Sequence, residues 1–517
     1  MSSLEDLRRV VARYQYAFDE PATIEFVAAV HEAGLLTADE WERIKGFLQE
    51  AMQSLRPEPA RKKETLVFNL DADPRNADWI KIVHASRLAG HKMPHWAALW
   101  FWWLGSHREE GPFWPAVGRV ASRLGYERLD SQTAPPDEQL PLAERALVLI
   151  RNSRLGTPII SGTDGRWTSL QFSDEHVTDL RDRFRGALVG GAIGDAMGRP
   201  NEGRSTEVAR ERQLRDYQPW HGWTSGPKGT ITDDTQMTMW LAEAIVAAAA
   251  RAAEAGEGDL RDQLLDPDEL ATRFTRERIR GIGKATREFV RNYKDLGKPW
   301  YEAGVPSAGN GTAMRAAPVG LVHLGDPYRI YRDSLLQSVV THRDSMAVAG
   351  ATCQAYAAAR AATALPGAFA SLDQRVALCA ECATLLEGLE RPGYELRGST
   401  GAASLHGRVG VELPRYLETG RAPFADWHNG AYVLESLPCA LWCFLASPED
   451  FAATLFAAVD AGHDADTVAA MACSVSGAYH GYARLPQRLL ADLEYHDRLV
   501  KLADDLHDLH RRVYGAS

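Results

Sequence analysis

The stretch AGHDADTVAAMACSVSGAYHG, residues 461–481, combines a glycine turn, two aspartates, a threonine and a long apolar run. Gly462 and the polar residues after it predict a turn that leads into the start of a helix. Short oxygen side chains at such a position accept hydrogen bonds from backbone amides that have no partner in the helix. One such side chain is enough to cap a helix, but three stand here: Asp464, Asp466 and Thr467. The excess predicts a role beyond capping.

A second cluster of the same kind stands far upstream, in the stretch GTITDDTQMT at 229–238. Its threonines and paired aspartates again precede a helical run, QMTMWLAEAIVAAAARAAEA. Because carboxylate and hydroxyl oxygens are the ligands that Mg²⁺ and Mn²⁺ prefer, two such helix starts predict a single hard-cation site. The candidate metal ligands are Thr232, Asp233, Asp234, Asp464, Asp466 and Thr467.

Glycines recur at every fourth position of a predicted helix that begins near residue 181. They are Gly186, Gly190, Gly194 and Gly198. Glycine costs about 1 kcal/mol relative to alanine inside a helix, so four on one face predict very close approach by a neighbouring helix. Asp195 lies in the same apolar helix, where an unpaired carboxylate would be costly. Such a residue serves a functional site more often than a surface.

The composition limits the class of protein. A chain of 517 residues predicts two or more domains, and its 45% hydrophobic and 25% charged residues are typical of soluble globular proteins. The net charge of -11 argues against a nucleic-acid backbone as the main partner. Residues 1–15 lack the apolar stretch of a secretory signal, and no apolar run is long enough to cross a membrane. We therefore expect a cytoplasmic protein.

A boundary between two domains is predicted near residue 176. Residues 128–142 are rich in proline and polar side chains, as loops and linkers are. From about Arg181 the composition changes to alanine- and glycine-rich helix, and nothing after that residue requires a β-sheet. We expect a separate, mainly helical N-terminal domain at 1–175 and an all-α domain, a helical bundle, at 176–517.

Three local patterns in the N-terminal region lead to specific predictions. Thr37 followed by Glu40 predicts a capping box at the start of a helix. The tryptophan-rich stretch 96–104 predicts a buried core, with a protein-binding surface as the less favoured alternative. Asp164-Gly165 predicts the turn of a β-hairpin.

The six cysteines do not form a disulfide framework in so long a chain. Cys379 and Cys382 form a CxxC motif, and Cys439 and Cys443 lie one helical turn apart. Both pairs fall within apolar helical patterns. Buried thiols are therefore expected in preference to a zinc site.

Six motifs in a fixed order link the C-terminal region to a known family. They are GALVGGAIGDAMGRPNE (186–202), GTITDDTQMT (229–238), GNGTAMRAAPVGL (309–321), THRDSMAVAGA (341–351), YVLESLPCALWCF (432–444) and AGHDADTVAAMACSVSGAYHG (461–481). Together they resemble the ADP-ribosylglycohydrolase family, which includes dinitrogenase-reductase-activating glycohydrolases and animal ADP-ribosyl-acceptor hydrolases. The resemblance covers roughly 181–500. It implies an orthogonal all-α bundle with a dinuclear Mg²⁺ or Mn²⁺ centre in a cleft.

Carried over residue by residue, the resemblance assigns the two threonine-aspartate clusters to the two halves of the metal centre. It also places Asp233 and Asp466 among the catalytic residues. Glu202 matches the glutamate beside the ribose, where it would position the scissile sugar or relay a proton. The segment that wraps the diphosphate and the distal ribose is matched by Ser307, Gly309, Asn310, Gly311 and Met314, with His342 close to it.

The sequence departs from the family pattern in two places. His463 stands where many members have a second glycine, which would alter the rim of the site without removing a ligand. The segment RGIGKAT, 280–286, lacks the carboxylate that the nitrogenase-regulating members carry near this position. A catalytic base from that loop is therefore not expected. The first 175 residues match nothing in the family core, and target recognition is the role considered for them.

The resemblance implies a metal-dependent hydrolase that releases ADP-ribose from modified proteins by cleaving a glycosidic C–N bond. ADP-ribosylarginine is the expected linkage, and serine-linked or free ADP-ribose derivatives are the alternatives. A hypothesis of another class is an immunity or binding protein that neutralises an ADP-ribosylating toxin by occlusion, and a metal-dependent phosphohydrolase is a third. An idle site has no need of six candidate metal ligands, so the enzyme is favoured.

Overall fold

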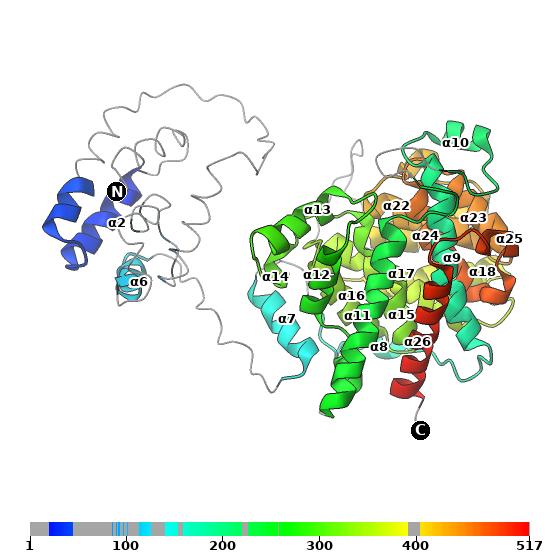
Figure 1. The fold of residues 1–517 in the computed structure, drawn as a ribbon, viewed down its shortest axis with the longest axis horizontal. Coiled ribbons are helices and arrows are strands. Elements are labelled where there is room, and N and C mark those ends of the chain that lie inside the picture. The colour runs from blue at the N-terminus through cyan, green and yellow to red at the C-terminus, as the bar shows by residue number, and fades with distance from the viewer. Residues whose placement is uncertain are drawn as a thin grey trace. The chain divides into compact units, whose positions relative to one another are not determined.

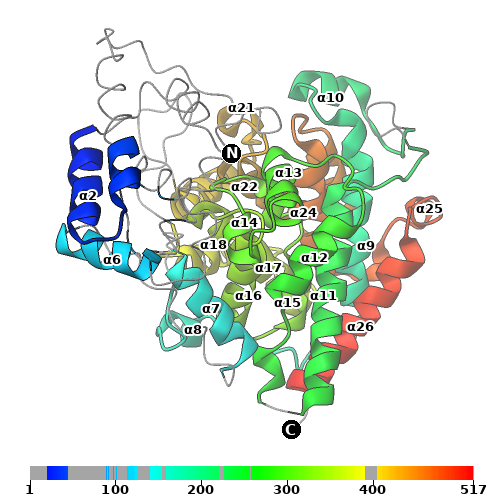
Figure 2. The ribbon, with the colours of Figure 1, turned by 60° about the vertical axis from the view of Figure 1, so that its left-hand side comes forward.

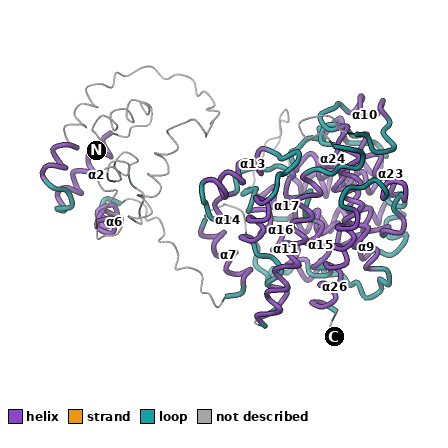
Figure 3. The backbone as a smooth tube through the Cα atoms, in the orientation of Figure 1, coloured by secondary structure: helices purple, strands orange, loops and turns teal. Residues whose placement is uncertain are grey.

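The computed structural model describes the greater part of the chain. The described residues are 20–44, 85, 89, 91, 93, 97, 101, 113–125, 140–153, 159–219, 226–256, 258–390 and 404–515. The chain divides into two compact units, Met1–Pro135 and Pro136–Ser517. Every regular element among the described residues is a helix (Figure 3), and the β-structure found there consists of isolated bridges. The all-α prediction is confirmed.

The second unit is a bundle of helices joined by short loops (Figure 1). Its α-helices are α7 (Leu142–Asn152), α8 (Arg166–Ser169), α9 (Leu180–Gly198), α10 (Thr206–Arg212), α11 (Asp233–Ala255), α12 (Pro267–Arg276), α13 (Lys284–Val290), α14 (Trp300–Ala303), α15 (Ala317–Val322), α16 (Pro327–Val339), α17 (Ser345–Thr363), α18 (Leu372–Leu386), α19 (Leu405–Gly407), α20 (Leu413–Thr419), α21 (Phe424–Trp427), α22 (Val433–Ala446), α23 (Phe451–Val459), α24 (Ala465–His480), α25 (Gln487–Leu490) and α26 (His496–Tyr514). None of the helices described is both long and apolar enough to span a bilayer.

The first unit has a small core of its own, formed in part by α2 (Glu20–Glu32) and α6 (Phe113–Arg123). Phe101 packs against Phe113 with ring centroids 5.9 Å apart. The predicted capping box is confirmed: the Thr37 amide donates to the Glu40 carboxylate at 2.8 Å, and the Glu40 amide donates to the Thr37 hydroxyl at 3.2 Å. The tryptophans of the 96–104 stretch lie outside the described residues.

The β-hairpin predicted at Asp164-Gly165 is wrong, because this turn leads into the short helix α8. The Asp164 carboxylate accepts a hydrogen bond from the Arg166 amide at 3.0 Å and from the Arg166 side chain at 2.9 Å. An aspartate that bonds the backbone two residues onward closes a turn by itself and needs no second strand. The helix then buries Trp167, which stacks on Tyr331 at 5.3 Å between ring centroids.

The division between the two units lies at Pro135, earlier than the boundary expected near residue 176. The intervening segment packs on the second unit, because α7 and α8 bury apolar side chains in the large core of the bundle. Ile150, Trp167 and Leu170 belong to that core. The Tyr331 hydroxyl of α16 also accepts a hydrogen bond from the Ile160 amide at 3.0 Å.

The helices α9 and α24 run antiparallel and pack closely against each other. A Cβ added at Gly186, Gly190, Gly194 or Gly198 would lie 2.1, 2.6, 2.2 or 2.4 Å from the backbone oxygen of Gly477, Cys473, Ala469 or Ala465, respectively. Each step of four residues along α9 thus matches four residues backward along α24. The close contact predicted from the glycine spacing is confirmed. This register brings the last turn of α9 to the first turn of α24.

Gly190→Leu is expected to destabilise the second unit by about 3 kcal/mol or more, because overpacking a core forces backbone shifts. Its Cβ would lie 2.6 Å from the Cys473 carbonyl oxygen, which belongs to a helix backbone and cannot rotate away. Thermal and chemical denaturation measure the loss. Gly165→Ala is the control, because its Cβ would meet nothing within 4 Å. Equal stability of the two variants would contradict the packing argument.

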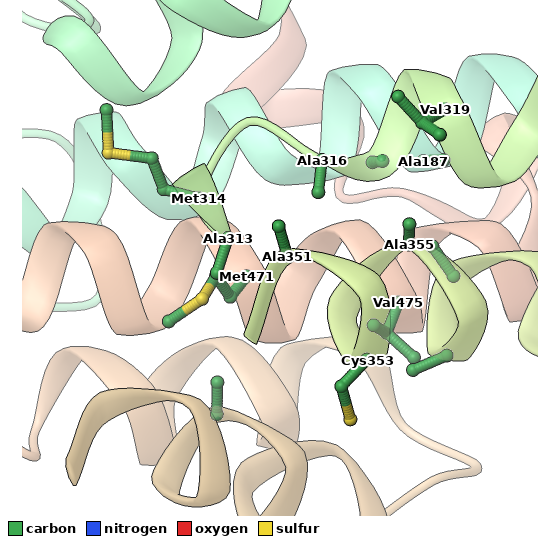
Figure 4. Packing of buried hydrophobic residues seen from close by; sticks show 14 of the residues in the cluster. Ala187, Ala313, Met314, Ala316, Val319, Ala351, Cys353, Ala355, Met471 and Val475 are labelled. Atoms are coloured by element: carbon green, nitrogen blue, oxygen red, sulfur yellow. The ribbon is translucent and has the colours of Figure 1, made fainter. Parts of the chain in front are cut away.

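Small side chains also bring α15, α17 and α24 together at the centre of the unit (Figure 4). A Cβ added at Gly320 of α15 would lie 2.0 Å from the Ala355 carbonyl oxygen of α17. The helix α26 packs against α9 and α11 (Figure 2). All six cysteines are free and buried, as expected, and the candidate metal groups among the described residues are all acidic.

Candidate metal centre and active site

The site lies where α9 ends and where α11 and α24 begin. Gly198, the last residue of α9, is so close to α24 that an added Cβ would lie 2.6 Å from the Asp466 Cα. The chain then makes one turn of 3₁₀ helix, Arg199–Asn201, and reaches Glu202. The glycine register of α9 on α24 therefore places Glu202 beside the aspartates of the second cluster.

Asp195 ties the first cluster to the same place. This fully buried carboxylate accepts hydrogen bonds from the amide and hydroxyl of Thr232, at 2.9 and 2.8 Å. It also accepts them from the amide and hydroxyl of Thr235, at 3.2 and 2.6 Å. Four donors from the first turn of α11 therefore converge on one side chain of α9. The sequence pattern marked Asp195 as a site residue, but not the partners that hold it.

Three buried carboxylates form what we call the inner group: Asp195, Asp234 and Asp466. One oxygen from each lies within 4.8 Å of the others. The Thr232 hydroxyl also lies 3.0 Å from the Asp234 Oδ2, while the buried Oδ1 of Asp234 has no hydrogen-bond partner among the described residues. A buried carboxylate oxygen without a donor is costly unless a cation binds it. The inner group therefore fits a divalent metal ion.

A second set, which we call the outer group, consists of Glu202, Asp464 and Asp466, again with one oxygen from each within 4.8 Å of the others. Asp466 belongs to both groups. Its side chain is 4% exposed, whereas that of Glu202 is 38% exposed. Glu202 thus stands at the open side of the site. The Arg199 guanidinium pairs with Glu202 and donates to Asp466 at 3.2 Å.

Asp464 is held in place by a side chain from one other segment and by a backbone carbonyl from a second. The Asn310 amide donates to its carboxylate at 2.5 Å and to the Ser436 hydroxyl at 3.1 Å. The backbone amide of Asp464 donates to the Asn429 carbonyl at 3.0 Å. Burial raises the pKa of Asp464, and hydrogen bonds from Asn310 and Thr467 oppose that rise. Asn429 and Ser436 are supporting residues that the sequence interpretation missed.

Asp233 is half-buried and belongs to neither carboxylate group. Its Oδ1 lies 2.9 Å from the position that a Cβ on Gly281 would occupy. Gly281 has φ +72°, a conformation that strains other residues, so the 280–286 loop can lie directly over Asp233 only with glycine here. Gln236 fixes this loop by accepting from the Arg280 amide at 2.8 Å.

His463 directly precedes Asp464, just before the first turn of α24. Its amide donates to the Arg204 carbonyl at 2.6 Å, and its carbonyl accepts from the Gly203 amide at 2.7 Å. The residue has φ +53°, a backbone conformation that favours glycine. Its ring lies 4.6 Å from that of His428, between centroids. The histidine ring thus contacts His428, and His463 belongs to neither carboxylate group.

The glycine-rich loop contacts the outer group through the hydrogen bond of Asn310 to Asp464. The Gly309 amide donates to the Ser307 hydroxyl at 3.3 Å. Buried His342 supports the loop from below, because a Cβ on Gly311 would lie 2.9 Å from the His342 Cε1. Burial, with a smaller contribution from the Arg315 charge, lowers the pKa of His342 to about 3, so the ring is neutral. Met314 lies deeper and lines a small pocket together with Asp234.

Burial raises the pKa of the carboxyl groups at the centre. The pKa of Asp466 is raised to about 7 by burial and by the charge of Asp464. The pKa of Asp233 is raised to about 8 by burial and by the charges of Asp466 and Asp195. The pKa of Asp195 rises only to about 6, because its threonine donors oppose the effect of burial. Protons therefore compete with a cation for these groups near neutral pH.

A divalent cation is expected to raise the melting temperature more at about pH 8.5 than at about pH 6. These carboxyl groups have a folded-state pKa above their unfolded value of about 4. The metal-free fold therefore loses stability as the pH rises from the unfolded value to the folded-state pKa. This loss of stability is complete above the folded-state pKa, and a bound cation offsets it most at those pH values. Melting curves in Mg²⁺ and in EDTA at both pH values measure the difference. A shift that does not depend on pH would contradict the raised pKa values.

A model of the family described as ADP-ribosylglycohydrolase matches residues 176–516. ADP-ribosylhydrolase ARH3 of Bos taurus is 27% identical over 355 residues, which cover 63% of this chain and 92% of the relative. ADP-ribosylarginine hydrolase Tri1 of Serratia proteamaculans is 26% identical over 335 residues, covering 63% and 79%. ADP-ribosyl-[dinitrogen reductase] glycohydrolase of Rhodospirillum rubrum is 25% identical over 316 residues, covering 61% and 91%.

The family match spans the residues that build both carboxylate groups, from Asp195 to Asp466. It begins in the loop before α9 and ends just after α26. The chain therefore belongs to the ADP-ribosylglycohydrolase family and is a glycohydrolase.

Proposed function

We propose that the chain removes ADP-ribose from arginine side chains of modified proteins and so reverses mono-ADP-ribosylation. The observation that carries this proposal is the pair of carboxylate groups that share Asp466, with Glu202 at the open side. A relative named as an ADP-ribosylarginine hydrolase and another named as acting on dinitrogen reductase support a protein-linked substrate. The reaction adds water across the glycosidic C–N bond and yields ADP-ribose and an unmodified arginine.

Mg²⁺ or Mn²⁺ is the proposed cofactor, because every candidate ligand offers a hard oxygen atom. Asp234 and Asp466 are the proposed ligands of the inner group, with Asp195 completing it. Glu202, Asp464 and Asp466 are those of the outer group. When bound, such cations orient the ribose hydroxyls and lower the pKa of a water molecule.

The chain's own residues have separate tasks in the proposed reaction. Glu202 is exposed enough to meet the scissile ribose, and its carboxylate would position that sugar or relay a proton at Oε2. Asn310 holds the Asp464 carboxylate in its position within the outer group through a hydrogen bond. Asp233, with its raised pKa, remains a proposed catalytic residue beside the Gly281 loop.

The segment that contains Ser307, Gly309, Asn310, Gly311 and Met314 is the proposed binding site for the diphosphate and the distal ribose. Backbone amides in a glycine-rich segment of this kind can donate hydrogen bonds to an anion. His342 is neutral and buried beneath it, so it would shape the loop without supplying charge.

Incubation with arginine-linked and serine-linked ADP-ribosylated proteins, with free ADP-ribose derivatives as a third substrate, tests the proposal. Release of ADP-ribose from the arginine-linked protein in Mg²⁺, and its loss in EDTA, is the expected result. Faster release from the serine linkage would overturn the linkage but keep the hydrolase. Toxin neutralisation without any release would instead support an immunity protein that acts by occlusion.

A further inference from the structure

Arg199 lies inside the proposed metal centre, and nothing assigned so far explains a cation there. Its side chain is 12% exposed, and its Nη1 contacts two of the three outer-group carboxylates, Glu202 and Asp466. The third member, Asp464, has an oxygen within 4.8 Å of theirs. A positive charge therefore occupies the region that a second divalent cation would need.

The backbone keeps Arg199 at this position. The preceding residue, Gly198, touches the backbone of α24 at Ala465 and Asp466. The side chain therefore starts within a few bonds of the outer group, at the entrance to the turn that carries Glu202. The loop at Gly281 lies beside it, because a Cβ there would lie 3.8 Å from the Arg199 Nη1.

The inner group has a different environment. Among the contacts described, its hydrogen-bond donors are neutral threonine groups, apart from the Arg199 contact to the shared Asp466. Among the described residues, the buried Oδ1 of Asp234 has no hydrogen-bond partner. One group is thus open to a cation, while the other already contains a guanidinium.

We infer that Arg199 serves as a built-in cation in the outer group, so that the protein binds one divalent ion tightly and a second one only when Arg199 leaves. Like charges a few ångströms apart in a partly buried site repel strongly. The guanidinium also neutralises part of the carboxylate charge that would attract the second ion. This inference rests on the metal-dependent function proposed above, and it differs from the two-metal centre that the family resemblance implies.

Titration of the metal-free protein with Mn²⁺ tests the inference without a substrate. The electron paramagnetic resonance signal of free Mn²⁺ counts the bound ions, and magnetic coupling at low temperature reports two ions side by side. We expect one tight site in the unmodified protein and a second whose Kd is at least about tenfold weaker. Arg199→Met is expected to tighten the second site by about tenfold or more and to produce the coupled signal.

Two variants control the interpretation. Arg204→Met removes the same charge from the same loop, but the Arg204 guanidinium donates to the Pro200 carbonyl, and no contact to the carboxylate groups is described for it. It should leave both Kd values unchanged. Arg199→Lys retains the charge and should keep the second site weak. Two equally tight sites in the unmodified protein would overturn the inference, whether or not Arg199→Met folds.

The inference also fails if Arg199→Met leaves the second site unchanged, or if Arg204→Met has the same effect as Arg199→Met. These outcomes are independent of ADP-ribose release. A protein that binds one Mn²⁺ tightly and releases no ADP-ribose would contradict the proposed function and leave the role of Arg199 supported.

Discussion

Asp466→Asn is expected to lower kcat/KM for ADP-ribose release by at least about a hundredfold, and to leave the helical content nearly unchanged. Asp466 is the only residue that belongs to both carboxylate groups found among the described residues. Losing its charge weakens every cation-binding arrangement that the site offers. The asparagine has the same shape, so the first turn of α24 should persist. Steady-state kinetics with Mn²⁺ titration and circular dichroism measure the two effects.

Asp373→Asn is the matched control for this variant. Asp373 is the second residue of α18, as Asp466 is of α24, so both substitutions remove a charge that favours a helix N-terminus. Asp373 is exposed and belongs to neither carboxylate group. It should retain full activity. If Asp466→Asn retained activity and Mn²⁺ affinity as well, the shared-ligand interpretation would be wrong.

Much of the site could be predicted from sequence because its residues occur in local patterns. The surplus of aspartate and threonine at two helix starts was visible without any structure, and the structure brings Asp234 and Asp466 together. The four-residue glycine spacing predicted a close helix contact correctly. Both patterns follow from the helical repeat, so each can be recognised within a single segment of the sequence.

What the sequence could not show are the partners that join distant segments. The spacing of the glycines does not indicate which helix packs against them, and only the structure identifies that helix as α24. Asp195 was recognisable as a site residue, but its four donors come from α11. The sequence does offer one overlooked signal: Arg199 precedes Glu202 by three residues, a spacing at which two side chains meet on a helical turn.

The one wrong turn prediction also has a physical reason. Asp164-Gly165 is compatible with several turn types, and the following residues were too few for a helical period to be recognised. The predicted boundary near residue 176 follows the composition change at Arg181, whereas the division into compact units lies at Pro135. The alanine- and glycine-rich composition marks the helices of the family core, whereas the division into compact units depends on which segments bury apolar side chains against that core. The segment between the two boundaries therefore falls outside the core by composition but inside the second unit by packing.

A fragment of residues 136–517 is expected to fold, to bind Mn²⁺ and to release ADP-ribose from ADP-ribosylarginine, whereas 173–517 is expected to aggregate. The shorter fragment lacks Ile150, Trp167 and Leu170, which the bundle buries. Deleting one large buried side chain costs about 2 to 5 kcal/mol, and a whole domain is stable by only about 5 to 15 kcal/mol. Light scattering and thermal melting of both fragments measure the difference.

The same fragments test the role of the first unit. Both carboxylate groups lie in the second unit, so catalysis on a small substrate should not need residues 1–135. If the first unit selects the protein target, 136–517 should retain the rate of the full chain on ADP-ribosylarginine and lose most of its rate on the modified protein. Full activity on both substrates would exclude target selection as the function of the first unit.

A well-folded 136–517 fragment that cleaves neither substrate would instead show that the catalytic site depends on the first unit. A well-folded and active 173–517 fragment would mean that α7 and α8 are dispensable, and that the core ends where the family resemblance begins.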